Sequence, residues 1–287
     1  MAAWELRPLS LGEILDRTFT LYRQNFLLFL GISALPHLLI LGVNLVQTLI
    51  LMPAPSGTAG GAPPVPRASS GLLAFGFSGL LILVFVYMVA FLFAQGGTIF
   101  AVSDLYLGRP TSIGSSLGKM WGELLNLFGV TLLNGLAVIA GCIFLIIPGI
   151  YLMCRLLTSV PAALLEDLGA RQALERSFAL TKDNAGRAFV IFVLYLLMLY
   201  AAMLLFAMPF LVLLGFTARD PGMLRVSMAL LQVGNFLAGI LVGPFLLIAT
   251  SVFYYDLRVR KEAFDLQLMM NPSGNPSGGP SVPTMLA

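Results

Sequence analysis

The sequence predicts an all-α polytopic membrane protein with six transmembrane helices and about three amphipathic interfacial helices on the cytoplasmic side. Three observations support this fold class. Of the 287 residues, 59% are hydrophobic and only 10% are charged, whereas about a quarter of a soluble domain is charged. The mean hydropathy is +0.95. Long apolar segments also follow one another and leave no room for a separate soluble core.

The first amphipathic helix is predicted to begin after Ser10. Ser10 and Glu13 have the spacing of a capping box. The residues that follow on one apolar face are Leu11, Ile14, Leu15, Thr18, Phe19 and Tyr22. Residues 26–51 then form an apolar run about 39 Å long as a helix, which is enough for one tilted span. Residues 53–71, rich in Pro, Gly, Ala and Ser, predict a flexible loop.

The second span covers residues 72–107 and would be roughly 54 Å long as one helix, which exceeds a hydrocarbon core of about 30 Å. We therefore expect it to extend beyond the bilayer on the inner side, with residues 95–98, Gln-Gly-Gly-Thr, as its weak point. Ser112 is expected to cap a second amphipathic helix that leads into span three, residues 124–147.

A turn at Pro148-Gly149 leaves residues 150–165 for a short fourth span. Residues 168–184 predict the third amphipathic helix. Its apolar face consists of Ala170, Ala173, Leu174, Ser177, Phe178 and Thr181. Spans five and six are expected over residues 187–215 and 226–255. Residues 1–266 thus form a single membrane domain, and the Pro/Ser/Gly-rich residues 267–287 a disordered tail.

The basic residues predict the orientation. Twelve of the sixteen Lys and Arg residues fall on one side of the spans: Arg7, Arg17, Arg23, Arg109, Lys119, Arg171, Arg176, Lys182, Arg187, Arg258, Arg260 and Lys261. Three fall on the other side, and Arg155 lies within a span. The positive-inside rule therefore places both termini in the cytoplasm of a multi-pass protein of the cytoplasmic (inner) membrane. Membrane orientation therefore explains the positions of the basic residues better than nucleic-acid binding does.

The residue types needed for catalysis are scarce. His37 is the only histidine, and it falls inside the first span, so neither a histidine-based triad nor a histidine-rich metal site can be assembled. Gly96-Gly97 has no neighbouring Lys-Ser/Thr pair of the kind found in phosphate-binding loops. We therefore expect no enzyme activity, no catalytic residues, no cofactor and no metal.

Two sets of polar residues inside the spans are candidate functional positions. Ser33, His37, Asn44 and Thr48 share a stripe about 60° wide on span one. Asn134 and Asn235, in spans three and six, are placed to meet this stripe and form a polar interior. Interhelical hydrogen bonds that fix packing, worth about 0.6 kcal/mol each, are one interpretation, and a transport path is the other.

Arg155 is the one charged side chain well inside a span, roughly 9 Å beyond the Gly149 turn. We expect its side chain to lean toward the outer face. There it either extends to the lipid headgroups or binds a lipid phosphate or another anion.

Four stretches carry a resemblance to a known family: RPLSLGEILDRTFTLYRQNF, AVSDLYLGRP, IPGIYLMCRLLTSVPAALLE and YYDLRVRKEAFDL. Together they resemble the membrane domain of bacterial glycerophosphoryl diester phosphodiesterases, over roughly residues 7–266. The resemblance implies six spans in a bacterial cytoplasmic membrane. It does not imply phosphodiesterase activity, because that chemistry belongs to a separate barrel. Ala263 departs from the glycine that the family tends to have there.

These observations favour a non-enzymatic integral membrane protein that scaffolds partners or handles lipid. The alternative is a small transporter or permease with a polar path between its helices. The expected partners are the lipid bilayer, with an anionic lipid as candidate ligand, and a protein partner; nucleic acid is not expected.

Overall fold

The computed structural model describes residues 7–46, 48, 70–217 and 221–262, and it describes the side chains of these residues except 70–80 and 221. This part of the chain forms ten helices and no strand, which confirms the all-α fold. Six segments are apolar and long enough to cross a membrane, so the chain is a polytopic membrane protein. The predicted loop over 53–71 lies almost wholly outside the described residues, and the predicted tail lies wholly outside them.

Helix α1 (Leu11–Gln24) is the first predicted amphipathic helix, and it begins with the predicted capping box between Ser10 and Glu13. Its packed face is rotated from the expected one, because Phe19 is 55% exposed while Arg17 is buried. The Arg17 guanidinium donates to the Tyr106 hydroxyl at 2.7 Å, which makes a basic side chain part of the packed face. Helix α2 (Phe26–Val46) follows.

Helix α3 (Ser70–Tyr106) is a single helix of 37 residues. The expected weak point at residues 95–98 is wrong, because the helix continues through it. A Cβ added at Gly96 would lie 1.9 Å from the Met120 Sδ, and one at Gly97 would lie 2.9 Å from the Leu117 Cδ2. The two glycines therefore allow the next helix to approach closely.

Helix α4 (Ile113–Phe144) begins at the predicted Ser112 cap. The second amphipathic helix is not a separate element, which corrects the prediction. It forms the first turns of α4, because no residue that would stop a helix separates it from the third span. The described residues thus include two separate amphipathic helices, α1 and α7.

The residues predicted as the fourth span form α5 (Ile146–Arg155) and α6 (Ser159–Leu165). The turn before it lies at Leu145, earlier than predicted, and Pro148 falls inside the first turn of α5. Helix α7 (Ala170–Thr181) confirms the third amphipathic helix. Three residues of its predicted apolar face, Ala173, Ser177 and Thr181, are buried.

The fifth span is interrupted at Ala207, two residues before Pro209, giving α8 (Ala185–Phe206) and α9 (Met208–Thr217). Helix α10 (Pro221–Glu262) is 42 residues long and contains Pro244.

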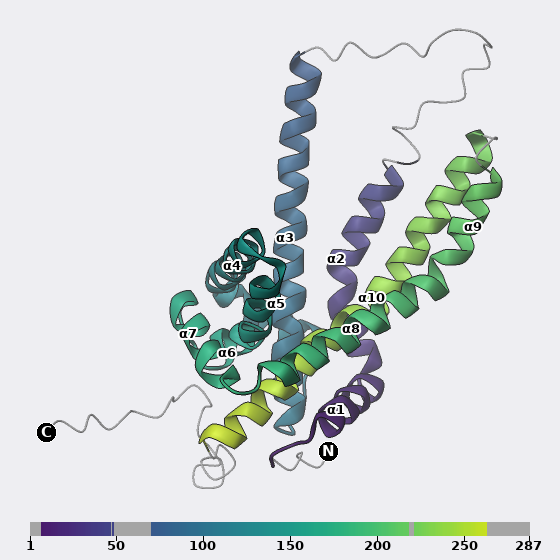
Figure 1. Ribbon diagram of the computed structural model, residues 1–287. Coiled ribbons are helices and arrows are strands. Elements are labelled where there is room, and N and C mark those ends of the chain that lie inside the picture. Colours follow the sequence, from purple (N-terminus) through teal and green to yellow (C-terminus); the bar gives the residue numbers. More distant parts are fainter. Residues whose placement is uncertain (1–6, 47, 49–69, 218–220, 263–287) are drawn as a thin grey trace, which may run out of the picture.

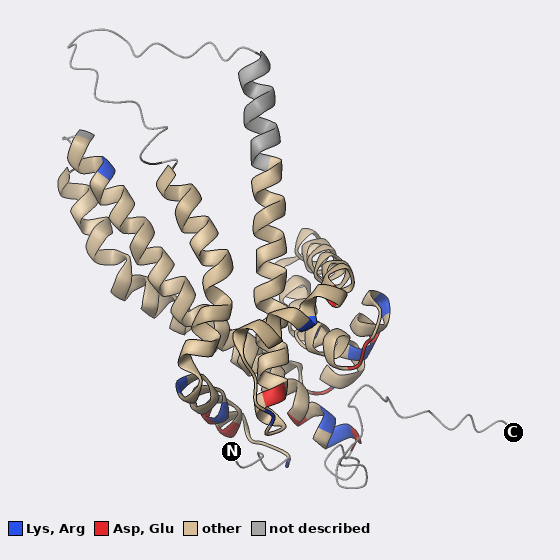
Figure 2. Ribbon diagram, turned by 180° about the vertical axis from the view of Figure 1, so that it is seen from behind, with Lys and Arg blue, Asp and Glu red and all other residues tan. Residues whose placement is uncertain are grey.

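Charged side chains gather at one end of the molecule. Figure 1 shows α1, α7 and the C-terminal end of α10 at this end, while α2, α3 and α9 extend to the opposite end. Figure 2 shows most basic and acidic residues at the end formed by α1, α7 and the C-terminal part of α10, which we call the charged end. Helices α4 and α5 are seen close to end-on in Figure 1, so they run across α3 rather than along it.

Candidate functional site

A buried ionic cluster joins three helices at the charged end. Glu166, which ends α6, accepts hydrogen bonds from the Arg176 Nε at 2.8 Å and from the Tyr254 hydroxyl at 2.7 Å. The Arg258 side chain, 2% exposed, lies 3.1 Å from Glu262 and 3.7 Å from Glu166. Burial lowers the pKa of Arg176, but the hydrogen bonds and charges of Glu166 and Glu262 outweigh it and raise this pKa. Ion pairs between its arginines and glutamates therefore stabilise the cluster.

A second cluster is centred on Asp256, whose side chain is fully buried. The carboxylate accepts hydrogen bonds from the Leu9 backbone N–H at 2.6 Å, the Arg187 Nη1 at 2.8 Å and the Arg260 Nε at 3.0 Å. Arg187 also donates to the Leu9 carbonyl at 2.8 Å. Asp256 therefore fastens the segment before α1, the start of α8 and the end of α10 to one another.

Sequence reasoning did not predict which residues pair in either cluster. Their signal was the group of acidic and basic residues directly after an apolar run, in Tyr254-Tyr-Asp-Leu-Arg-Val-Arg-Lys-Glu262. Each acidic residue in them is matched by arginine, which is the arrangement of a structural connection. Within the described part of the chain, no three His, Cys, Asp or Glu residues are grouped to hold a metal ion.

Arg155 lies at the end of α5 and contacts α7. Its Nη2 donates to the Phe178 carbonyl at 2.7 Å, and its guanidinium lies 5.2 Å from the Phe178 ring centroid and 5.8 Å from that of Tyr151. The expected lean toward the outer face is therefore wrong. The chain turns directly after Arg155, so the side chain reaches α7 instead. An anion contact at Arg155 stays a prediction.

The predicted polar stripe on α2 does not converge with the other polar residues. Ser33 donates to the Ile240 carbonyl at 3.3 Å, and the His37 ring packs against Gly239. Thr48 donates back to the Asn44 carbonyl at 2.8 Å. In the other spans, Asn134 donates to Ser159 on α6, and Asn235 is exposed. Ser33 and His37 thus contact each other and the same stretch of α10, and Thr48 contacts Asn44. Asn134 instead pairs with α6.

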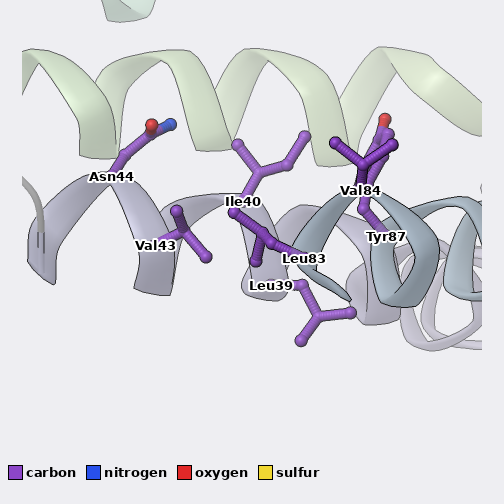
Figure 3. Close-up of a pocket in the computed structure, with 7 residues that line it drawn as sticks. All are labelled: Leu39, Ile40, Val43, Asn44, Leu83, Val84 and Tyr87. Atoms are coloured by element: carbon purple, nitrogen blue, oxygen red, sulfur yellow. The ribbon is translucent and has the colours of Figure 1, made fainter. Parts of the chain in front are cut away.

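Asn44 lies in an apolar groove between α2 and α3, with a volume of about 250 Å³. The groove is lined by Leu39, Ile40, Val43, Asn44, Leu83, Val84 and Tyr87. Figure 3 shows Asn44 and Tyr87 pointing toward the same side, while Leu39 points away from it. The volume is below the about 300–1,000 Å³ of drug-sized pockets.

A second groove of about 250 Å³ lies on α3's other flank, against α4. Its lining is also apolar apart from one hydroxyl: Met88, Phe91, Leu92, Phe128, Thr131, Leu132, Gly135, Leu136 and Ile139. Helix α3 therefore separates two grooves on segments apolar enough to cross a membrane. We take the groove between α2 and α3 as the candidate site, because it alone of the two contains an amide.

Comparisons of the chain with protein-family models, with curated proteins and with solved structures found no match. The resemblance to the phosphodiesterase membrane domain stays a prediction carried by the motifs quoted above.

Proposed function

We propose that this chain is a non-enzymatic lipid-handling protein of the bacterial cytoplasmic membrane, with its charged end and both termini in the cytoplasm. The proposed ligand is one acyl chain of a phospholipid, held in the groove between α2 and α3. The observation that carries the proposal is this groove, because its lining is apolar except for Asn44 and Tyr87.

The position of the groove favours a lipid as occupant. Both of its helices are apolar enough to cross a membrane, so phospholipid is the molecule that surrounds them. Asn44 lies two residues before the end of α2 and supplies an amide to the groove lining. Tyr87 supplies a hydroxyl within the α3 wall of the groove. A chain with a polar group at one end matches this lining.

Transport through a polar path is the alternative function. Such a path requires polar side chains that converge on a shared interior. Ser33 and Thr48 donate instead to backbone carbonyls, and Asn134 donates to Ser159. These contacts favour packing over transport. Scaffolding of a protein partner stays a prediction, because none of the contacts described here favours a particular partner.

Filling the groove tests the proposal. We expect Val43→Phe to reduce the phospholipid that remains bound after detergent exchange, measured by native mass spectrometry. Leu197→Phe is the matched control, because Leu197 is 67% exposed on α8 and does not line the groove. Equal lipid retention by Val43→Phe and the unmodified protein would contradict the proposal. Solute uptake by proteoliposomes that persists in Val43→Phe would favour transport.

A further inference from the structure

We infer that the hairpin of α4 and α5 enters the bilayer from the charged end and ends inside the hydrocarbon layer. Its tip then contacts lipid acyl chains and does not reach the opposite aqueous face. This inference goes beyond the proposed function and depends on different residues.

The first observation is the composition of the tip. Residues 135–154, GLAVIAGCIFLIIPGIYLMC, contain no charged residue and no Ser, Thr, Asn, Gln or His. The other two connections expected on the outer side contain charges, namely Arg67 in one and Arg219 with Asp220 in the other. A turn that emerged into water beside them would be expected to carry polar residues too. The hairpin tip has the composition of a segment surrounded by hydrocarbon.

The second observation is exposure. At the tip, Phe144 is 83% exposed, Ile146 71% and Ile147 79%. Large apolar side chains that project in this way are unfavourable in water and favourable in lipid. No described part of the chain covers them, so hydrocarbon is the solvent that fits.

The third observation is the backbone of the turn. A helix start normally leaves about four N–H groups without an intrahelical partner, and each is costly in lipid. Here the Leu145 N–H donates to the Gly141 carbonyl at 3.1 Å, and Pro148 has no N–H. The Gly149 N–H donates to the Leu145 carbonyl at 3.3 Å. The turn therefore presents about half the usual number of unpaired donors.

The arms of the hairpin also pack through glycine. A Cβ at Gly149 would lie 2.1 Å from the Cys142 Sγ, and one at Gly141 would lie 3.0 Å from the Gly149 Cα. Small residues that let two helices approach closely are typical of helix pairs inside membranes.

The fourth observation is the direction of α4. From Leu117 to Ile139 this helix advances about 33 Å. Over that distance the α3 residues that it faces run from Gly97 to Met88, which is about 14 Å along α3. Figures 1 and 2 both show α4 close to end-on beside an upright α3. A helix inclined in this way gains less than half of its length in depth along α3, so its tip stays below the level reached by α2, α3 and α9.

Spin labelling at Ile146 tests the depth of the tip. The protein carries Ile146→Cys with Cys142→Ala and Cys154→Ala, is labelled with a nitroxide and is reconstituted into phospholipid liposomes. We expect collisions with oxygen to exceed those with a water-soluble nickel complex by at least tenfold. Met223→Cys, 57% exposed near the start of α10, is the matched outer control and should collide readily with nickel.

Nickel accessibility at Ile146 equal to that at Met223 would overturn the inference. If the protein without cysteines folds poorly, Cys154 is kept, because it is 3% exposed, and its own labelling is subtracted. A membrane-impermeant maleimide provides the second measurement. It should modify Met223→Cys in right-side-out vesicles and leave Ile146→Cys unmodified; modification of Ile146→Cys would also overturn the inference.

Discussion

The Ser33 hydroxyl on α2 shares its single proton between the Ile240 carbonyl on α10, at 3.3 Å, and the Leu30 carbonyl of its own helix, at 3.1 Å. Pro244 lies four residues after Ile240 and has no N–H, so the Ile240 carbonyl lacks its helical donor. The neighbouring Leu241 carbonyl accepts a hydrogen bond from the Tyr22 hydroxyl at 2.7 Å. Helices α1 and α2 thus supply donors next to the position where Pro244 removes a backbone donor from the continuous helix α10.

The stability lost on removal of the Ser33 hydroxyl should therefore depend on the presence of Pro244. We expect Ser33→Ala to lower the free energy of unfolding by about 0.6 kcal/mol, the average for a hydrogen bond between membrane helices. In a Pro244→Ala background the Ile240 carbonyl regains a helical donor, so Ser33→Ala should cost less. Thermal unfolding of the four proteins measures the difference. An equal cost in both backgrounds would contradict this explanation.

Gly239 should tolerate no larger residue while His37 is present. A Cβ at Gly239 would lie 2.7 Å from the His37 Cδ2. We expect Gly239→Ala to destabilise the protein by about 1–3 kcal/mol, the range for overpacking, and His37→Ala to relieve most of this loss. Gly42→Ala is the control, because nothing lies within 4 Å of its Cβ position. The measurement is thermal unfolding in detergent, and a neutral Gly239→Ala would refute the close contact.

Asp256 should be the most sensitive acidic residue among those that the structure describes. Asp256→Asn leaves Arg187 and Arg260 without their carboxylate, and breaking a buried ion pair costs about 3–5 kcal/mol. It should also release the segment before α1, which limited proteolysis would detect. Glu175→Gln, in an exposed pair with Arg171, should cost about 0.3–0.5 kcal/mol. Similar losses in the two variants would show that Asp256 is not a structural centre.

The orientation can be tested with reporters. We expect a fluorescent protein fused after Asp265 to fluoresce, because the positive-inside rule predicts a cytoplasmic location for Arg258, Arg260 and Lys261. A reporter that is active only in the periplasm should work at Gly60. A silent reporter at Gly60 together with an active one at Asp183 would show that the true topology is the inverse of the predicted one.

Hydrophobic periodicity and length predicted the long apolar helices well, since both follow from local sequence. The α1 cap and α7 were predicted for the same reason. Failures occurred where distant residues decide the outcome. Gly96 was predicted to weaken the helix, because its contact with Met120 cannot be inferred from periodicity. Arg155 was expected to face outward from the usual lean of helical side chains. Its bond to Phe178 could not be predicted, because it depends on how α7 folds back. The groove at Asn44 likewise requires two helices whose relative placement no local pattern gives.

Photochemical labelling tests most directly the proposal that the groove between α2 and α3 binds lipid. The protein is reconstituted with a phospholipid whose acyl chain carries a diazirine, irradiated, and digested for mass spectrometry. We predict that adducts concentrate on residues 39–44 of α2 and 83–87 of α3, and that Val43→Phe removes them. Labelling of exposed positions on α8, such as Leu197 and Tyr200, should be weaker and unaffected by Val43→Phe. Adducts spread evenly over α2, α3 and α8 would contradict a lipid-binding groove.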